Sequence, residues 1–166
     1  MGLFDMFKKK ETAPAFPAML AADAAGTVVK MEDIPDEVFA QGILGQCCGI
    51  DPSEGKVYAP CDGEITQAPD TLHALGIAGK NGIEVLIHVG VDTVEMKGDG
   101  FSAKVKLGDK ITKGQLLLTM DLDKIKADGH PAVVITVVTN TDDFAEVTTV
   151  ASGAVKPGDD LMKIAK

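Results

Sequence analysis

The chain has 166 residues, of which 45% are hydrophobic, and it contains no tryptophan. A chain of this length is expected to form a single domain around one core, which must here be mainly aliphatic. Its formal charge of −9 argues against nucleic acid as a partner. No apolar run reaches the roughly 18 residues needed to span a membrane. Three cysteines without C-x-x-C spacing are typical of reduced thiols, so we expect a cytoplasmic protein.

The first 25 residues are predicted to be a flexible tail, because they mix proline, alanine and charge without periodicity. Within the tail, residues 1–10 (MGLFDMFKKK) place four apolar side chains before three lysines. This composition suits weak contact with the anionic inner face of a membrane through a short amphipathic helix, and the alternative is a frayed terminus. The folded domain is expected to cover residues 26–166.

From Gly26 onward, short apolar runs alternate with turn signals, as in compact β proteins. Strands are expected within 26–31, 55–70, 71–79, 83–91, 103–121, 132–139 and 160–165. One helical turn is expected after Pro35, and a short helix from Asp121 to Asp128, with Asp121 as N-cap and Gly129 as the stop. The predicted fold is therefore all-β, a single antiparallel β-sandwich or barrel-like domain with one or two short helices.

Two of the three histidines lie on either side of a hairpin signal. His73 precedes His88 by fifteen residues, and the intervening turn reads GKNG. In one register the two histidines pair directly, with Cβ atoms roughly 5 Å apart; with a two-residue Asn-Gly turn they are diagonal neighbours at about 7 Å. A three-residue loop would place them on opposite faces. Either of the first two registers predicts a shared site, and two separate structural histidines are the alternative.

Two imidazoles in an apolar setting suit phosphoryl transfer. Burial disfavours the charged imidazolium and keeps a ring nitrogen free to act as a nucleophile. The second histidine can then donate a hydrogen bond to the transferred group, with Thr71 bonded to the other nitrogen of His73. The segment from Val89 to Thr93 is expected to turn and aim backbone N–H groups at an anion. Because the sequence contains no phosphate-binding G-x-x-x-x-G-K-[ST] loop, phosphoryl groups are expected to arrive from another protein.

The run HVGVDTVEMKGDGF, with the upstream histidine in HALGI, resembles the glucose-type enzyme IIA family of the bacterial phosphoenolpyruvate-dependent sugar phosphotransferase system. The resemblance covers residues 30–166 and implies an antiparallel β-sandwich. It also implies that HPr phosphorylates Nε2 of His88 and that His88 passes the group to a cysteine of the IIB domain of a sugar permease. His73 would stabilise the phosphoryl group, with Thr71 orienting it. The unphosphorylated form would bind regulatory proteins.

The same resemblance implies a docking surface formed by Asp36, Phe39, Asp92 and Val94, with Asp92 facing a basic residue of HPr. No cofactor is required. In some relatives the histidine pair binds zinc together with a carboxylate from a partner, and the ligands here would be His73 and His88.

The sequence departs from the enteric members of this family at four positions that are aromatic around their site. These positions carry Pro69, Leu75, Leu86 and Val89. In addition, Glu37 occupies a position where an apolar contact residue is expected. We therefore expect a less aromatic docking face, which puts the enteric regulatory partners in doubt.

Two alternatives come from other protein classes. The run VEMKGDG resembles the modified loop of biotinyl and lipoyl carrier domains, with Lys97 as the attachment site. The other alternative is a zinc hydrolase that uses His73 and His88, although no H-x-H or H-E-x-x-H motif is present.

Overall fold

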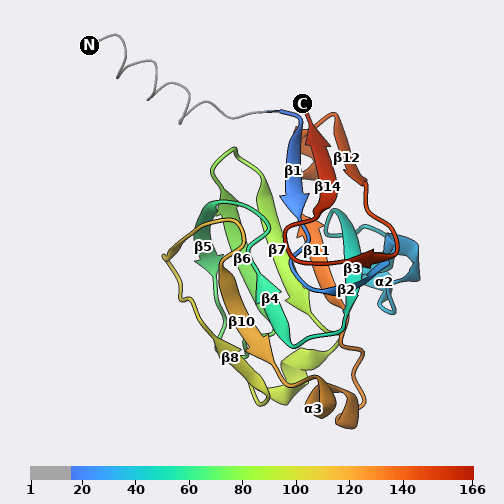
Figure 1. Cartoon of the computed structure of the whole chain (residues 1–166), viewed down its shortest axis with the longest axis vertical. Helices are drawn as coiled ribbons and strands as arrows, with labels where there is room; N and C mark the ends of the chain where they lie inside the picture. The colour runs from blue at the N-terminus through green and yellow to red at the C-terminus, as the bar shows by residue number, and fades with distance from the viewer. Residues whose placement is uncertain (1–15) are drawn as a thin grey trace.

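The computed structural model describes residues 16–166, and strands dominate this part of the chain (Figure 1). Over these residues the strands form one eight-stranded sheet and two three-stranded sheets, and every strand pair is antiparallel. The predicted all-β antiparallel fold is confirmed.

The eight-stranded sheet contains, in spatial order, β13 (Ala154–Val155), β2 (Gly26–Val29), β3 (Gln46–Pro52), β11 (Val134–Val138), β7 (Glu84–Val89), β6 (Ala74–Gly79), β5 (Gly63–Gln67) and β9 (Lys110–Ile111). The second sheet contains β1 (Ala18–Ala21), β14 (Asp160–Ala165) and β12 (Glu146–Thr149). The third contains β4 (Lys56–Tyr58), β10 (Leu116–Met120) and β8 (Phe101–Ala103).

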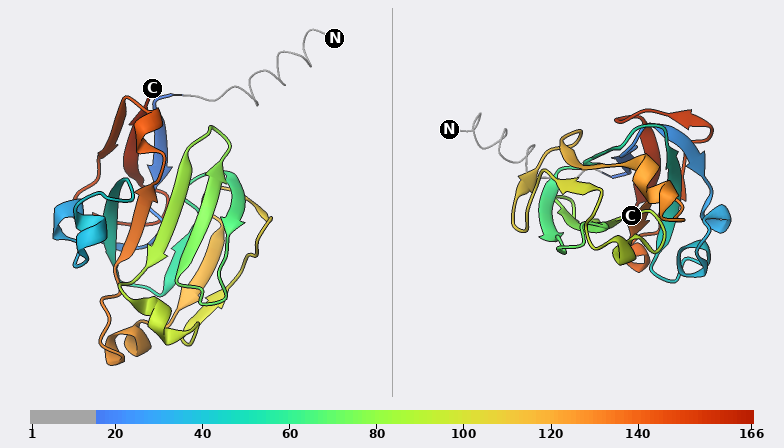
Figure 2. Two further views of the ribbon diagram at one scale, coloured as in Figure 1. Left: turned by 180° about the vertical axis from the view of Figure 1, so that it is seen from behind. Right: turned by 90° about the horizontal axis from the view of Figure 1, so that it is seen from below.

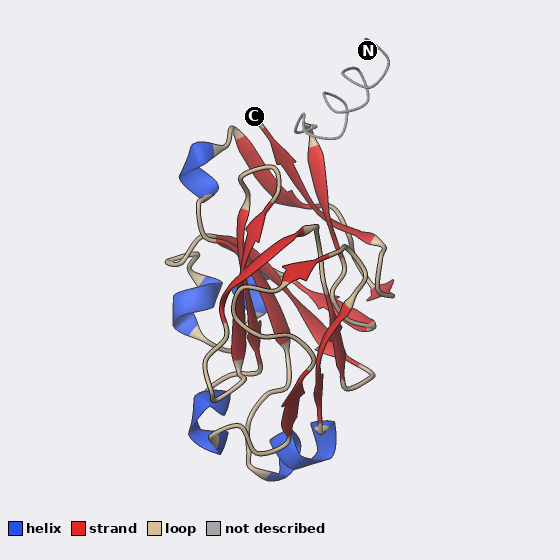
Figure 3. Cartoon of the chain, turned by 90° about the vertical axis from the view of Figure 1, so that its left-hand side faces the viewer, coloured by secondary structure: helices blue, strands red, loops and turns tan. Residues whose placement is uncertain are grey.

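Helices are confined to short connecting segments around the strands (Figure 3). Those described are α2 (Glu37–Ala40), α3 (Leu122–Ala127) and the 3₁₀ turns η1 (Met31–Asp33), η2 (Thr93–Met96) and η3 (Thr141–Asp143). Both predicted helices begin where expected, because Asp36 caps α2 and the Asp121 carboxylate accepts a hydrogen bond from the Lys124 N–H at 3.1 Å. Within residues 16–166, no helix is long and apolar enough to cross a membrane.

The two faces of β7 contact two separate apolar clusters. Val85, Ile87 and Val89 point into the main core between the sheets, whereas Leu86 lies on the opposite, outer face. On that outer face a second cluster forms from the central strands together with η1 and α2 (Figure 2, left). Because side chains alternate along a strand, His88 belongs to the outer face, beside this second cluster.

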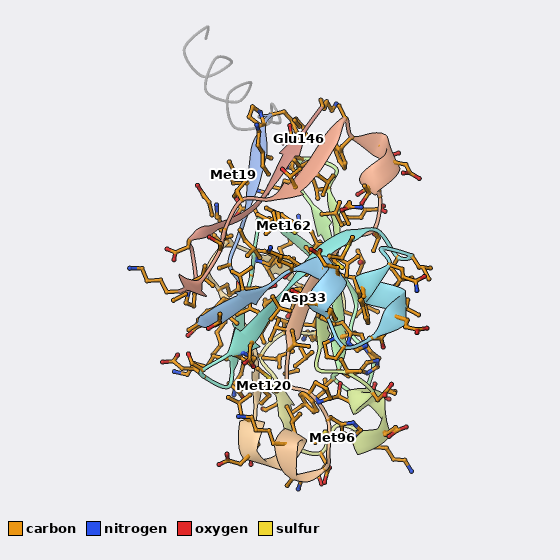
Figure 4. The ribbon with its side chains drawn as sticks, turned by 90° about the vertical axis from the view of Figure 1, so that its right-hand side faces the viewer. Met19, Asp33, Met96, Met120, Glu146 and Met162 are labelled. Carbon is orange, nitrogen blue, oxygen red and sulfur yellow. The ribbon has the colours of Figure 1, made fainter. Side chains whose placement is uncertain are left out.

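The predicted boundary at residue 25 is wrong, because part of the expected tail is folded. β1 pairs with β14 over Ala18–Ala21, and Ala22 and Ala24, which follow it, are buried. Figure 4 labels Met19 on β1 and Met162 on the neighbouring β14. The amphipathic segment predicted for residues 1–10 lies outside the described residues.

A buried carboxyl group follows β1. Asp23 is 0% exposed, and its Oδ2 atom accepts a hydrogen bond from the Thr136 hydroxyl at 2.5 Å. The other carboxyl oxygen, Oδ1, has no hydrogen-bond partner among the described residues. Burial raises the pKa of Asp23 to about 6, and the hydrogen bond from Thr136 opposes this rise. The native state therefore binds this proton more tightly than the unfolded chain, in which an aspartate pKa is about 4.

We predict that Asp23→Asn removes a pH-dependent loss of stability. In the wild type, the contribution of Asp23 is most favourable below about pH 4, falls as the pH rises toward 6, and then levels off. The free energy of unfolding of the wild type should fall by roughly 3 kcal/mol relative to the variant across this window. Urea unfolding at pH 4, 5, 6 and 7 measures the difference.

The control for this measurement is Asp142→Asn, which changes an exposed carboxylate on η3. It should leave the pH dependence of the wild type in place. A parallel pH dependence for Asp23→Asn and the wild type would show that Asp23 does not titrate in this range.

Candidate functional site

The hairpin that carries the two histidines has neither of the expected registers. β6 and β7 pair with Ala74 opposite His88 and Leu75 opposite Ile87. The Gly79 N–H donates to the Ile83 carbonyl at 2.8 Å, so three residues form the loop between them, and the last, Gly82, is left-handed with φ 85°. For a regular ladder, this register would place the two histidines on opposite faces of the sheet.

The two imidazole rings nevertheless meet, with centroids 5.3 Å apart and planes at 77°. His73 lies just before β6, where the alternation of faces does not apply. Leu72 has a left-handed backbone with φ 56°, and the His73 carbonyl accepts a hydrogen bond from the Val89 N–H at 2.7 Å. The predicted pairing of His73 and His88 is therefore correct, but the expected reason for it is wrong.

The His88 ring is oriented by the main chain that follows it. Its Nδ1 atom lies 2.7 Å from the Gly90 carbonyl oxygen. A carbonyl oxygen can only accept, so Nδ1 carries the proton and donates it. In the neutral ring, Nε2 then keeps its lone pair and is the nucleophilic atom. This role of Gly90 could not be predicted from the sequence, since a backbone acceptor leaves no signal in the side chains.

The surroundings keep the His88 ring mainly neutral. Burial lowers the pKa of His88, while the Gly90 carbonyl and the carboxylates of Asp36 and Asp92 oppose this shift. The Phe39 ring packs against the imidazole with a centroid separation of 4.9 Å. The site thus combines an apolar support with two nearby negative charges, which favour any positive charge that develops on the ring.

His73 has a side-chain partner of its own. The Thr71 hydroxyl lies 2.6 Å from Nδ1 of His73, as predicted. Burial lowers the pKa of His73, and the charge of His88 adds to this shift. When the hydroxyl donates to Nδ1, the ring proton resides on Nε2, where it is available to an oxygen atom of a bound group.

In the turn after β7, two of the N–H groups expected to face an anion have other partners. Its Gly90 N–H donates to the Val133 carbonyl at 2.7 Å, and its Val91 N–H donates to the Pro131 carbonyl at 3.0 Å. These two donors are therefore already used. The group of this turn that contacts His88 is the carbonyl of Gly90.

The four residues expected to form the docking surface have different environments. Asp36 is half-buried, Asp92 is exposed, and Val94 is 46% exposed. Phe39, in contrast, is only 5% exposed. Its ring supports His88 and does not lie on the open surface where a docking residue was expected.

Two of the four residues that replace aromatic residues of the enteric members are buried. Leu75 and Val89 are fully buried in the main core. Pro69 is exposed and Leu86 is partly buried on the outer face of the sheet. Of the expected changes to the docking face, these last two residues and the exposed Glu37 remain.

The residues described contain no group of three or more histidine, cysteine, aspartate or glutamate side chains arranged to hold a metal ion. A catalytic zinc site usually has three protein ligands, so the geometry gives no support to the zinc hydrolase alternative.

Comparisons with known proteins agree with the histidine site. Residues 18–144 match the family described as phosphoenolpyruvate-dependent sugar phosphotransferase system, EIIA 1. A PTS system glucose-specific EIIA component from Halalkalibacterium halodurans is 43% identical over 159 residues, which cover 95% of this chain and 92% of that protein. A PTS system glucosamine-specific EIICBA component from Bacillus subtilis is 46% identical over 118 residues, covering 71% of this chain and 19% of that protein.

The fold is also that of a solved relative. The glucose permease IIA from Mycoplasma capricolum superimposes with a TM-score of 0.80 at 33% sequence identity, and the match covers 90% of this chain and 96% of that structure. Neither the biotinyl or lipoyl alternative at Lys97 nor the zinc hydrolase gains support from these matches. The chain therefore belongs to the EIIA 1 family and is a phosphocarrier of the phosphoenolpyruvate-dependent sugar phosphotransferase system.

Proposed function

We propose that Nε2 of His88 accepts a phosphoryl group from HPr and passes it to a cysteine of the IIB domain of a glucose-type sugar permease. The observation that carries this proposal is the hydrogen bond from His88 Nδ1 to the Gly90 carbonyl, which leaves Nε2 as the nucleophile. A IIB acceptor is supported by the relative named EIICBA component, whose name joins an A part to a B part in one chain.

In the accepting step, the Nε2 lone pair forms a bond to phosphorus while the bond from phosphorus to the donor breaks. In the donating step, a thiolate attacks phosphorus and the electrons of the N–P bond return to Nε2. His88 would keep its Nδ1 proton throughout, because neither step requires its removal and the Gly90 carbonyl accepts it in the unphosphorylated ring. The ring carries a positive charge only while phosphorylated, and the carboxylates of Asp36 and Asp92 favour that charge.

His73 would stabilise the phosphoryl group during both steps. Its ring lies next to that of His88, and a Thr71 hydroxyl that donates to Nδ1 leaves the Nε2–H of His73 free to donate. A hydrogen bond to a phosphoryl oxygen strengthens as negative charge moves onto that oxygen. Thr71 thus acts on the group through His73.

The docking surface that we propose combines charge with a small apolar contact. Asp36 and Asp92 suit a basic side chain on the partner, which would also offset their repulsion of the incoming phosphoryl group. Val94 is the exposed apolar member, whereas Phe39 contributes by supporting His88. Binding of regulatory proteins by the unphosphorylated form remains a prediction.

The Nε2 atoms of the histidine pair also suit zinc. Both Nδ1 atoms are already engaged, so His73 and His88 would bind through Nε2, with further ligands supplied by a partner. We therefore propose that the isolated protein binds zinc weakly and that a partner carboxylate strengthens binding. Calorimetric titration of wild type and His73→Ala with zinc alone tests the contribution of the pair.

We predict that phosphorylation requires His88 and that efficient onward transfer requires His73. After incubation with phosphoenolpyruvate, enzyme I and HPr, the wild type and His73→Ala should each gain one acid-labile phosphate, whereas His88→Ala should gain none. Transfer from His73→Ala to a IIB domain should be slower on the order of 100-fold, since one stabilising donor is lost. Intact-protein mass and the rate of phosphate loss measure both effects.

A matched control for this experiment is His130→Ala, which removes the third histidine. It should be phosphorylated and dephosphorylated like the wild type. A wild-type protein that gains no phosphate from active HPr would disprove the proposal, and a phosphate on His88→Ala would move the nucleophile elsewhere.

A further prediction concerns the titration of His88. Because burial lowers its pKa below the usual value of about 6.5, more than half of the His88 rings should be neutral at pH 6.5. Since the nearby carboxylates raise this pKa, Asp36→Asn and Asp92→Asn should each lower it further. NMR titration of the His88 ring measures the pKa, with Asp142→Asn as a distant control. An increase of the pKa in either Asn variant would contradict the electrostatic role assigned to these carboxylates.

A further inference from the structure

The turn that presents the Gly90 carbonyl to His88 is held from one side by the chain leading into β11. The two amides of this turn, at Gly90 and Val91, donate to the carbonyls of Val133 and Pro131. The turn lies at the lower end of the sheet, next to the segment that connects α3 to β11 (Figure 2, left). The Val91 N–H lies in the same peptide plane as the Gly90 carbonyl, so its bond to Pro131 already restrains the direction of that carbonyl from this side.

Thr93 holds the turn from the other side. It is the first residue of η2, the short helical turn that Met96 marks in Figure 4, and it is 0% exposed. Its hydroxyl donates to the Val89 carbonyl, which precedes Gly90. Its methyl group packs against the glycine, because a Cβ atom at Gly90 would lie 2.4 Å from Thr93 Cγ2.

These two contacts restrict Gly90 on both sides of its Cα atom. The hydroxyl fixes the peptide plane between Val89 and Gly90, and the methyl group fills the space on one side of the Gly90 backbone. Gly90 has φ 76°, a left-handed conformation that glycine adopts readily. The remaining freedom of Gly90 is therefore limited, and its carbonyl points at His88 Nδ1, 2.7 Å away.

We propose that Thr93 is a positioning residue, which holds the Gly90 carbonyl against His88 Nδ1 and so fixes the tautomer that leaves Nε2 unprotonated. The hydrogen bond made by one ring nitrogen decides which nitrogen carries the proton. Without a well-placed acceptor, the proton can move to Nε2 and block the nucleophile. The consequence for phosphoryl transfer rests on the proposed function, whereas the tautomer itself can be measured without any transfer.

The test compares Thr93→Val, which keeps the shape but loses the hydroxyl, with Thr93→Ser, which keeps the hydroxyl. ¹⁵N NMR of the unphosphorylated protein should show His88 with its proton on Nδ1 in the wild type and in Thr93→Ser. In Thr93→Val, a large fraction of the molecules should have the His88 proton on Nε2. If the fraction of molecules with the proton on Nδ1 falls to about a tenth, the rate of phosphoryl acceptance from HPr should fall about tenfold.

The matched control is Thr139→Val. The Thr139 hydroxyl also lies within reach of a β7 carbonyl, that of Glu84 at 3.4 Å, but at the far end of the strand. Its loss should change neither the His88 tautomer nor the rate of acceptance. Thermal unfolding of all variants shows whether each is folded at the temperature of the NMR experiment.

A folded Thr93→Val protein that retains the proton on Nδ1 overturns the proposal, whatever happens to the rate. If Thr93→Val does not fold, Thr93→Ser decides, and a folded serine variant with the proton on Nε2 overturns it. A tautomer change in Thr93→Val, together with a wild type that accepts no phosphate, supports the role of Thr93 while disproving the proposed function.

Discussion

The site depends on one hydrogen bond, from Nδ1 of His88 to the carbonyl of Gly90. It fixes both the plane of the ring and the nitrogen that carries the proton. The fold supplies it locally, because the acceptor lies two residues beyond the donor and just past the end of β7. The bond in turn requires a left-handed Gly90, whose amide is tied to the segment that leads into β11. The His88 ring is thus oriented by a main-chain acceptor and not by a second polar side chain.

The electrostatics of the site balance two opposite effects. Burial favours the neutral ring, which is the nucleophilic form, whereas Asp36 and Asp92 favour the charged ring. A phosphorylated imidazole that keeps its Nδ1 proton is positively charged, so the same carboxylates suit the loaded carrier. Burial is the larger effect in the unphosphorylated ring, because the pKa of His88 is lowered overall. The T-shaped contact with His73 adds a donor without adding a fixed charge.

Local patterns in the sequence predicted the β6–β7 hairpin, the helical turn after Pro35, the N-cap Asp121 of α3 and the buried strand β11. They did not predict β1, whose short alanine-rich sequence becomes a strand only by pairing with the distant β14. They also missed the register of the hairpin, which its loop sets, and the left-handed backbone of Leu72, which no glycine or asparagine signals. The histidine pair could be predicted because two histidines on either side of a hairpin turn lie close together even when the strands are irregular. Backbone acceptors such as Gly90 leave no pattern in the side chains.

The conformation of Leu72 has a consequence for how this protein can change over evolution. A left-handed leucine costs on the order of 1–2 kcal/mol, yet its side chain also packs against the main core. Asparagine or glycine would relax the backbone but would give up that packing. Because the same backbone turns His73 toward His88, mutations that repack this part of the core also act on the geometry of the site. Core stability and histidine alignment are therefore coupled traits at this position.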